Sequence, residues 1–220
     1  MPNHRTPLAN GEFYHVYNRG VAKNPVFLSK HDYEQAILAL SYYLSSTPPM
    51  KLSRFKELSI EERGKVLNEL QNDASSVEIL SFVLMPNHFH LLIKQTGDNG
   101  ISTFLSKFTN SYTRYFNTKH QRVGALFQGV FKAVHVEDDE QLLHLSRYIH
   151  LNPVASFVIH EKDLLSYPWS SLPLFLNGKS SFVGITGRRA FSANAPWPII
   201  LLFVPPPLLP VSPVENGGKL

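Results

Sequence analysis

Residues 77–95 read VEILSFVLM-PN-HFHLLIKQ, and this stretch decides the fold. Two apolar runs, Val77–Met85 and His88–Gln95, flank the dipeptide Pro86-Asn87, which is typical of a turn. Runs of this length that contain β-branched and aromatic residues favour buried strands. We therefore expect two antiparallel strands joined by a tight turn.

The second of these strands begins with two histidines that flank one large apolar residue. Alternate side chains of a strand share a face, so His88 and His90 project together while Phe89 points to the opposite side. Two imidazoles held side by side on rigid backbone form a candidate pair of metal ligands. A His-x-His pair alone more often has no metal-binding role. A metal site is therefore expected only if the rest of the chain supplies a third ligand and groups that act on a substrate.

The other periodic segments complete a mixed fold. The expected strands are Phe13–Gly20 and Phe127–Val136, and the expected helices are Lys30–Leu44, Ile60–Leu70, Ile101–Thr118 and Asp138 to about Leu151. With Ile60–Leu70 set aside as part of an insertion, the order is strand, helix, strand, strand, helix, strand, helix. This order predicts an α+β fold, a ferredoxin-like split βαβ antiparallel sheet with an added C-terminal helix.

Composition changes mark an insertion and a tail. Residues 45–76 are polar and charged, which indicates an insertion of loop and short helix. Residues 176–220 are rich in proline and poor in charge, and we expect them to be poorly ordered. We therefore expect one domain over residues 1–175, followed by that tail.

Bulk properties exclude several classes of protein. The chain has no cysteine, so neither a disulfide scaffold nor a thiolate metal site is possible. Met1–Gly11 has no apolar core typical of a secretory signal, and prolines interrupt the apolar run Ile199–Val211. We expect a cytoplasmic protein that does not bind membranes.

The positive charge is unevenly distributed. Between Asp98 and Glu137 there is no acidic residue, and lysine and arginine side chains alternate with aromatic residues. Such a segment is typical of binding to a polyanion whose nucleobases can stack on aromatic rings. A solvent-exposed basic face of a helix would give the same sequence pattern. The candidate DNA contacts are Lys107, Tyr112, Arg114, Tyr115, Lys119, Arg122 and Lys132.

The last expected helix carries a second set of polar residues. Gln141, His144, Tyr148 and Asn152 recur at helical spacing away from its apolar stripe. If this helix packs over the sheet, Tyr148 and Asn152 face the histidine pair. The simpler interpretation is that Tyr148 is a packing residue and that Asn152 caps a helix stopped by Pro153.

Together these groups suit one reaction. A tyrosine hydroxyl attacks a phosphodiester and forms a covalent phosphotyrosine, leaving a free 3′-hydroxyl. Two imidazoles and an amide oxygen leave positions open on Mg²⁺ or Mn²⁺, which would polarise the phosphate. By residue type alone, Tyr112 and Tyr115 are rival nucleophiles and His135 and His144 are rival ligands. His150 is either a phosphate contact or simply exposed.

Four blocks of sequence resemble the REP-associated tyrosine transposases, a branch of the single-tyrosine HUH transposases. The blocks are Tyr14–Gly20, Met85–Leu92, Leu126–Lys132 and Tyr148–Val154, with Pro168–Ser171 as a trailing element. Their order and separations are similar to those of the family. The resemblance covers about residues 8–175.

The resemblance implies a ferredoxin-like fold and a metal-dependent, single-stranded DNA endonuclease and strand transferase. It implies that His88 and His90 are metal ligands, that Tyr148 is the nucleophile and that Asn152 is the third ligand. Family substrates are DNA hairpins formed by palindromic repeats, and the proteins work as monomers or homodimers. Two alternatives stay open: a DNA-binding regulatory relative that does not cleave, and a metal-dependent hydrolase that uses water.

Overall fold

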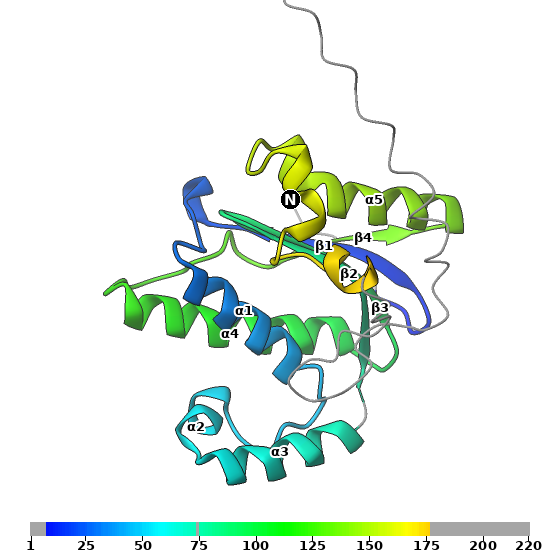
Figure 1. Cartoon of the computed structure of the whole chain (residues 1–220). Coiled ribbons are helices and arrows are strands. Elements are labelled where there is room, and N and C mark those ends of the chain that lie inside the picture. The colour runs from blue at the N-terminus through cyan, green and yellow to red at the C-terminus, as the bar shows by residue number, and fades with distance from the viewer. Residues whose placement is uncertain (1–7, 74, 177–220) are drawn as a thin grey trace, which may run out of the picture.

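The centre of the fold is a four-stranded antiparallel sheet with the strand order β2-β3-β1-β4 (Figure 1). The computed structural model describes residues 8–73 and 75–176. The strands are β1 Phe13–Arg19, β2 Val77–Met85, β3 His88–Gln95 and β4 Lys132–Val136. Because β3 lies between the parallel strands β1 and β2, this is the ferredoxin-like split βαβ arrangement, and the predicted fold class is confirmed.

Helices cover both faces of the sheet. The helices α1 Lys30–Tyr42 and α4 Gly100–Lys119 lie beneath one face, and α5 Asp139–Ala155 lies over the other (Figure 1). The shorter elements are η1 Val21–Lys23, α2 Leu52–Glu57, α3 Ile60–Asn72, η2 Glu161–Ser166 and α6 Leu172–Leu176. None of the helices in residues 8–73 and 75–176 combines the length and apolar character that crossing a membrane requires.

Alternation along β3 divides its side chains between two cores. Phe89, Leu91 and Ile93 belong to the larger core, which α1 and α4 cover. Leu92 belongs to the smaller core, where it meets Leu142 and other residues of α5. His88 and His90 share the face of Leu92, so they point toward α5.

The predicted hairpin has the observed bounds, but the last strand is shorter than predicted. The sequence pattern predicts Phe127–Val136, whereas β4 begins at Lys132. Phe127 is instead buried in the core and forms an isolated bridge with Gly20. Gly129 then takes a φ of 62°, a left-handed conformation that interrupts an extended chain.

The prediction that Asn152-Pro153 stops the last helix is wrong. Asp138 caps the start of α5 as expected, accepting from the backbone N–H of Gln141 at 2.7 Å. The helix then continues through Pro153 to Ala155, with Ser156 at its end. Burial of Asn152 and Pro153 holds this last turn in place, although proline lacks an N–H. Asn152 therefore keeps helical register with Tyr148, one turn earlier.

The segment 45–76 contributes to the core. Its helix α3 matches the predicted Ile60–Leu70, and α2 is a helix that the sequence pattern did not predict. Leu52, Phe55 and Leu70 are buried in the larger core. Almost all of the predicted tail, residues 177–220, lies outside the described residues.

The segment after η2 docks along the outer edge of β2. The N–H of Leu84 donates to the carbonyl of Trp169 at 2.8 Å, and the N–H of Ser171 donates to the carbonyl of Phe82 at 3.0 Å. Ser170 forms a bridge with Val83 between these two bonds. The trailing element Pro168–Ser171 is thus paired with the sheet.

Candidate active site

The two predicted ligand histidines lie at the start of β3, directly after the turn at Pro86-Asn87. Their ring centroids are 4.9 Å apart. His90 is buried and His88 is half-buried. Nδ1 of His88 lies 2.6 Å from Oδ1 of Asn87, so the turn residue orients this ring.

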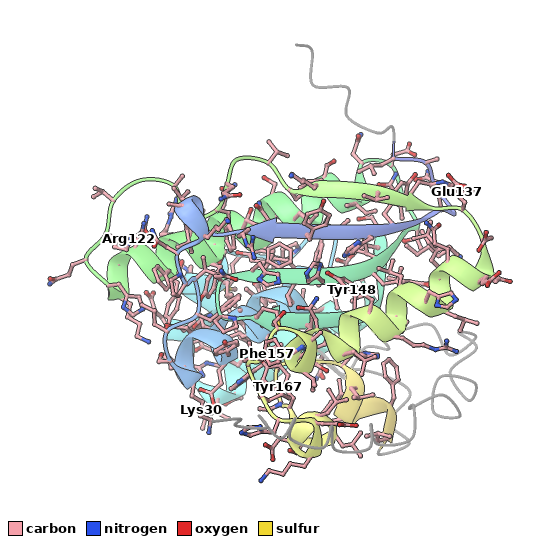
Figure 2. All side chains as sticks on the ribbon, turned by 90° about the horizontal axis from the view of Figure 1, so that it is seen from above. Lys30, Arg122, Glu137, Tyr148, Phe157 and Tyr167 are labelled. Atoms are coloured by element: carbon pink, nitrogen blue, oxygen red, sulfur yellow. The ribbon has the colours of Figure 1, made fainter. Side chains whose placement is uncertain are left out.

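Tyr148 is the predicted nucleophile, and α5 carries it over the sheet (Figure 2). Its ring centroid lies 5.6 Å from that of His90, with the two planes at 81°. The side chain is 50% exposed although it touches this cluster. The side chain is therefore only half buried, and part of it is open to solvent on the face of the histidine pair.

Asn152 lies one turn after Tyr148 and meets the other histidine. Its side chain hydrogen-bonds to His88, and its Oδ1 accepts from Oγ of Ser156 at 3.2 Å. Asn152 is buried, within the helix rather than at its cap. The structure therefore brings His88, His90, Tyr148 and Asn152 together.

Burial holds the imidazoles of this cluster neutral. It lowers the pKa of His88 to about 4, helped by the positive charge of Arg19 and opposed by the bond to Asn152. Burial also lowers the pKa of His90 to about 3, with smaller contributions from His15, His88 and Arg19. Both rings are neutral at pH 7, as a metal ligand must be.

Strand β1 supplies three residues to which the sequence pattern assigned no role. His15, Tyr17 and Arg19 alternate with buried Tyr14, Val16 and Asn18, so they share the face of the histidine pair. Tyr17 lies opposite His90 in register, and Arg19 lies opposite His88. Nε2 of His15 is 2.8 Å from Nδ1 of His90. Polar residues at every second position of a strand were the signal available for finding them.

Four of the predicted DNA contacts are hydrogen-bonded to other segments of the protein. Nζ of Lys107 donates to the carbonyl of Ser46 at 2.7 Å, and Nζ of Lys119 pairs with Asp32 at 2.7 Å. The hydroxyl of Tyr115 donates to the same carboxylate at 3.0 Å. Tyr112 is buried and donates to the backbone carbonyl of Val26, so the prediction that it contacts DNA is wrong.

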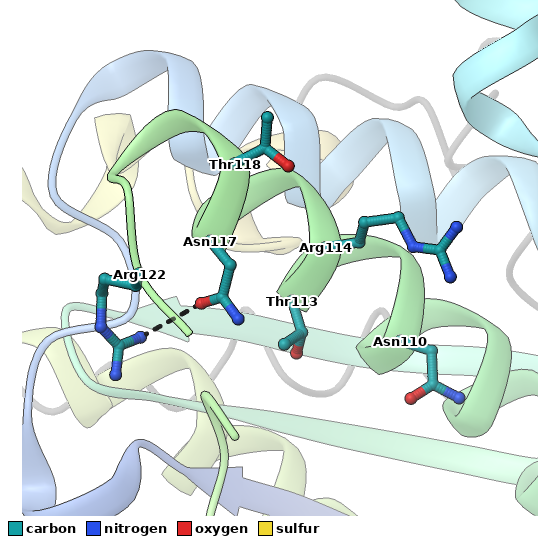
Figure 3. A pocket seen from close by; sticks show the side chains of 6 residues that line it. All are labelled: Asn110, Thr113, Arg114, Asn117, Thr118 and Arg122. Atoms are coloured by element: carbon teal, nitrogen blue, oxygen red, sulfur yellow. Dashed lines mark hydrogen bonds between the residues drawn. The ribbon is translucent and has the colours of Figure 1, made fainter. Parts of the chain in front are cut away.

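The other three predicted contacts are exposed around the edge of the sheet at β4. Arg114 and Arg122 line a polar depression at the C-terminal half of α4, where the guanidinium of Arg122 donates to Oδ1 of Asn117 at 3.4 Å (Figure 3). Lys132 lines a groove of about 970 Å³ between α4 and β4, and its Nζ lies 5.9 Å from the ring centroid of Tyr17. Asn110 lines both hollows, so they adjoin.

The rival candidates lie elsewhere. His135 pairs with Glu12 at 2.7 Å and is opposite Tyr14 in register, on the other face of the sheet. His144 is exposed, with Glu140 3.7 Å away. His150 is buried, and its Nε2 lies 2.7 Å from Oγ of Ser171, so it does not reach a phosphate.

The residues of the cluster fit a divalent cation. Within the described ranges, no three His, Cys, Asp or Glu side chains are grouped so as to hold a metal. The candidate set is instead two neutral imidazoles and one amide, His88, His90 and Asn152. Imidazole nitrogen and amide oxygen bind divalent ions, and three protein ligands leave positions for phosphate and water.

We expect the free energy of unfolding to fall as the pH drops below 6.5. Burial lowers the pKa of His150 to about 3, against about 6.5 in the unfolded chain. The stabilisation is complete above pH 6.5 and is lost on acidification, because the unfolded chain binds the proton first. Protonation of His150 in the unfolded chain should by itself lower the free energy of unfolding by about 2 kcal/mol between pH 6.5 and 5.

Urea unfolding in EDTA at several pH values measures this effect. His150→Gln keeps a polar partner for Ser171 and should give a shallower decline, whereas the exposed control His144→Gln should not. A free energy of unfolding that stays constant between pH 6.5 and 5 would contradict the assignment.

Comparison with solved structures supports the fold. One match is the structure described as the REP-associated tyrosine transposase bound to a REP hairpin, with a TM-score of 0.56 and 15% identity, covering 89% of this chain and 96% of that chain. Another is a putative transposase from Deinococcus radiodurans R1, with a TM-score of 0.37 and 13% identity over 68% of this chain and 95% of that chain. At 15% identity, the first match shows a shared fold.

Comparison of the sequence shows the family. No curated protein matches the chain. The family model described as "Transposase IS200 like" matches residues 40–152, which is just over half of the chain and includes β2, β3, α4, β4 and most of α5. The candidate residues His88, His90, Tyr148 and Asn152 all lie within the matched range. The protein therefore belongs to the IS200-like transposase family.

Proposed function

We propose that this transposase is a metal-dependent endonuclease and strand transferase of single-stranded DNA, with Tyr148 as its nucleophile. The observation that carries the proposal is the half-exposed Tyr148 ring 5.6 Å from His90, above the histidine pair. A tyrosine that is accessible and next to neutral imidazoles can attack a phosphate bound between them.

The reaction is a transesterification. The phenolic oxygen of Tyr148 loses its proton and attacks phosphorus, the bond from phosphorus to O3′ breaks, and O3′ takes up a proton to become a free hydroxyl, so that no proton is gained or lost overall. The product is a 5′-phosphotyrosine, so the energy of the phosphodiester is kept for rejoining. Attack on this linkage by another 3′-hydroxyl restores Tyr148 and joins the strands.

We assign His88, His90 and Asn152 to hold Mg²⁺ or Mn²⁺. When bound there, the ion would polarise the scissile phosphate and offset the charge that develops on it. The protein itself supplies the orientation: Asn87 fixes the ring of His88, and α5 places Asn152 and Tyr148 on the same side of the sheet.

The two adjoining hollows support a path for the DNA. The path runs from Arg114 and Arg122 through the groove at Lys132 to Tyr17, whose ring lies 5.7 Å from that of His90. Exposed lysine and arginine side chains along such a groove suit the phosphate backbone of DNA. The related solved structure is described as bound to a REP hairpin, and we propose hairpin-forming repeat DNA as the substrate here.

Adduct trapping tests the proposed function. The protein is incubated with a labelled DNA hairpin that carries a single-stranded flank, with Mn²⁺ or Mg²⁺ or with EDTA, and is then denatured. We expect a covalent DNA adduct only with metal, and mass spectrometry should place it on Tyr148. Cleavage without an adduct would indicate hydrolysis by water, and binding without cleavage would indicate a regulatory relative.

Removing the two arginines of the α4 depression should weaken DNA binding in a salt-dependent way. Each basic side chain that binds a phosphate adds about one to the slope of log affinity against log salt. We expect Arg114→Gln with Arg122→Gln to lower that slope by about two. Fluorescence anisotropy over a salt series measures it.

Lys30→Gln is the matched control, because Lys30 is an exposed base on α1 that pairs with Glu34. It should leave affinity and slope unchanged. Equal slopes for the double variant and the wild type would remove the depression from the proposed path.

A further inference from the structure

His15 of β1 is hydrogen-bonded to the histidine pair through its side chain. Nε2 of His15 and Nδ1 of His90 are 2.8 Å apart, and the two rings lie within 24° of parallel. The backbone of His15 is fixed on both sides, since it pairs with Leu92 of β3 and with Val134 of β4. The partner of His90 is therefore held by the centre of the sheet.

A hydrogen bond between two imidazoles uses one proton, and its position has a consequence for His90. If His15 donates, the proton of neutral His90 lies on Nε2, and that nitrogen cannot bind a metal. If His90 donates from Nδ1, its Nε2 keeps a free lone pair. The direction of this single bond decides whether His90 is a ligand.

His88, the neighbouring candidate ligand, also has a hydrogen-bond partner at its Nδ1. Nδ1 of His88 lies 2.6 Å from the amide oxygen of Asn87, which can only accept, so His88 donates from Nδ1 and keeps a lone pair on Nε2, on which Asn152 or a metal can act. A metal shared by both rings requires His90 to present Nε2 in the same way, since the rings are neighbours on one face of β3. Metal-binding histidines commonly donate their other nitrogen to a second residue that fixes the tautomer.

We propose that His15 is a positioning residue that accepts from Nδ1 of His90 and so directs Nε2 of His90 toward the metal. The effect on the metal rests on the proposed function, whereas the position of the proton on His90 is a property of the metal-free protein. It gives a role to the histidine of the block Tyr14–Gly20.

Two measurements on wild type, His15→Phe and His15→Gln test the proposal. Long-range ¹H–¹⁵N NMR of the metal-free proteins reports which nitrogen of His90 carries the proton. Calorimetric titration with Mn²⁺ reports affinity. His15→Phe keeps an aromatic ring but removes the acceptor, and His15→Gln restores one. His135→Phe is the matched control, a histidine of the same sheet on its other face.

We expect wild-type His90 to be protonated on Nδ1, and His15→Phe to move that proton toward Nε2 and weaken Mn²⁺ binding about 10- to 100-fold. His15→Gln should recover most of the affinity, and His135→Phe should match the wild type. A folded His15→Phe with unchanged tautomer and affinity overturns the proposal, as does wild-type His90 protonated on Nε2. If the wild type has the expected tautomer but binds no Mn²⁺, the assignment of the metal fails while the role of His15 in setting the tautomer holds.

Discussion

Tyr148→Phe is expected to abolish the covalent DNA adduct while leaving DNA binding intact. The substitution removes only the attacking oxygen, and removal of an enzyme nucleophile lowers turnover by at least about a thousandfold. The ring of Tyr148 is half exposed and meets His90 by its edge, so phenylalanine fits the same place. Stability should change by no more than about 0.5 kcal/mol. The measurement is adduct yield on hairpin DNA with Mn²⁺, beside anisotropy for binding.

Tyr115→Phe is the control, because Tyr115 is a half-buried tyrosine whose hydroxyl bonds to Asp32. It should form the adduct at the wild-type rate. An adduct that persists in Tyr148→Phe would assign the chemistry to another residue. Loss of both adduct and binding would mean that Tyr148 holds the DNA.

Phe89→Ala is expected to lower the free energy of unfolding by about 3–5 kcal/mol. Phe89 is fully buried, and its ring centroid lies 5.4 Å from that of Phe108 and 5.6 Å from that of Phe127. Alanine leaves a cavity between β3, α4 and the loop before β4. Urea unfolding at pH 7 measures the loss.

Val123→Ala is the comparison, since Val123 is 92% exposed and should change stability by less than about 0.5 kcal/mol. A loss below about 1 kcal/mol in Phe89→Ala would mean that the core closes around the deleted ring.

The hairpin of β2 and β3 could be predicted from the sequence to the residue, because strand periodicity and a Pro-Asn turn act locally. The end of α5 could not. A local rule stops a helix before proline, but burial of Asn152 and Pro153 against the sheet extends it by a turn. The basic, aromatic character of its segment predicts a DNA contact at Tyr112, but its stripe with Phe104 and Phe108 is the core face.

The candidate residues that could be named from the sequence are those recognised by residue type and spacing. The residues that reach the site only through the register of neighbouring strands could not. His88, His90, Tyr148 and Asn152 stand out as metal-binding or nucleophilic groups at regular spacing. His15 lies 75 residues from His90 in the chain, and only the pairing of β1 with β3 brings the two rings together. That pairing is a property of the sheet and not of either segment.

The docking of Trp169–Ser171 on β2 has a consequence for how copies of this protein behave toward one another. β2 is the outer strand on its side of the sheet, and nearly every residue in it is buried. Left bare, an apolar edge strand offers free N–H and carbonyl groups on which a second chain can extend the sheet. The docked segment occupies those groups at Phe82 and Leu84, so it protects the protein against edge-to-edge aggregation.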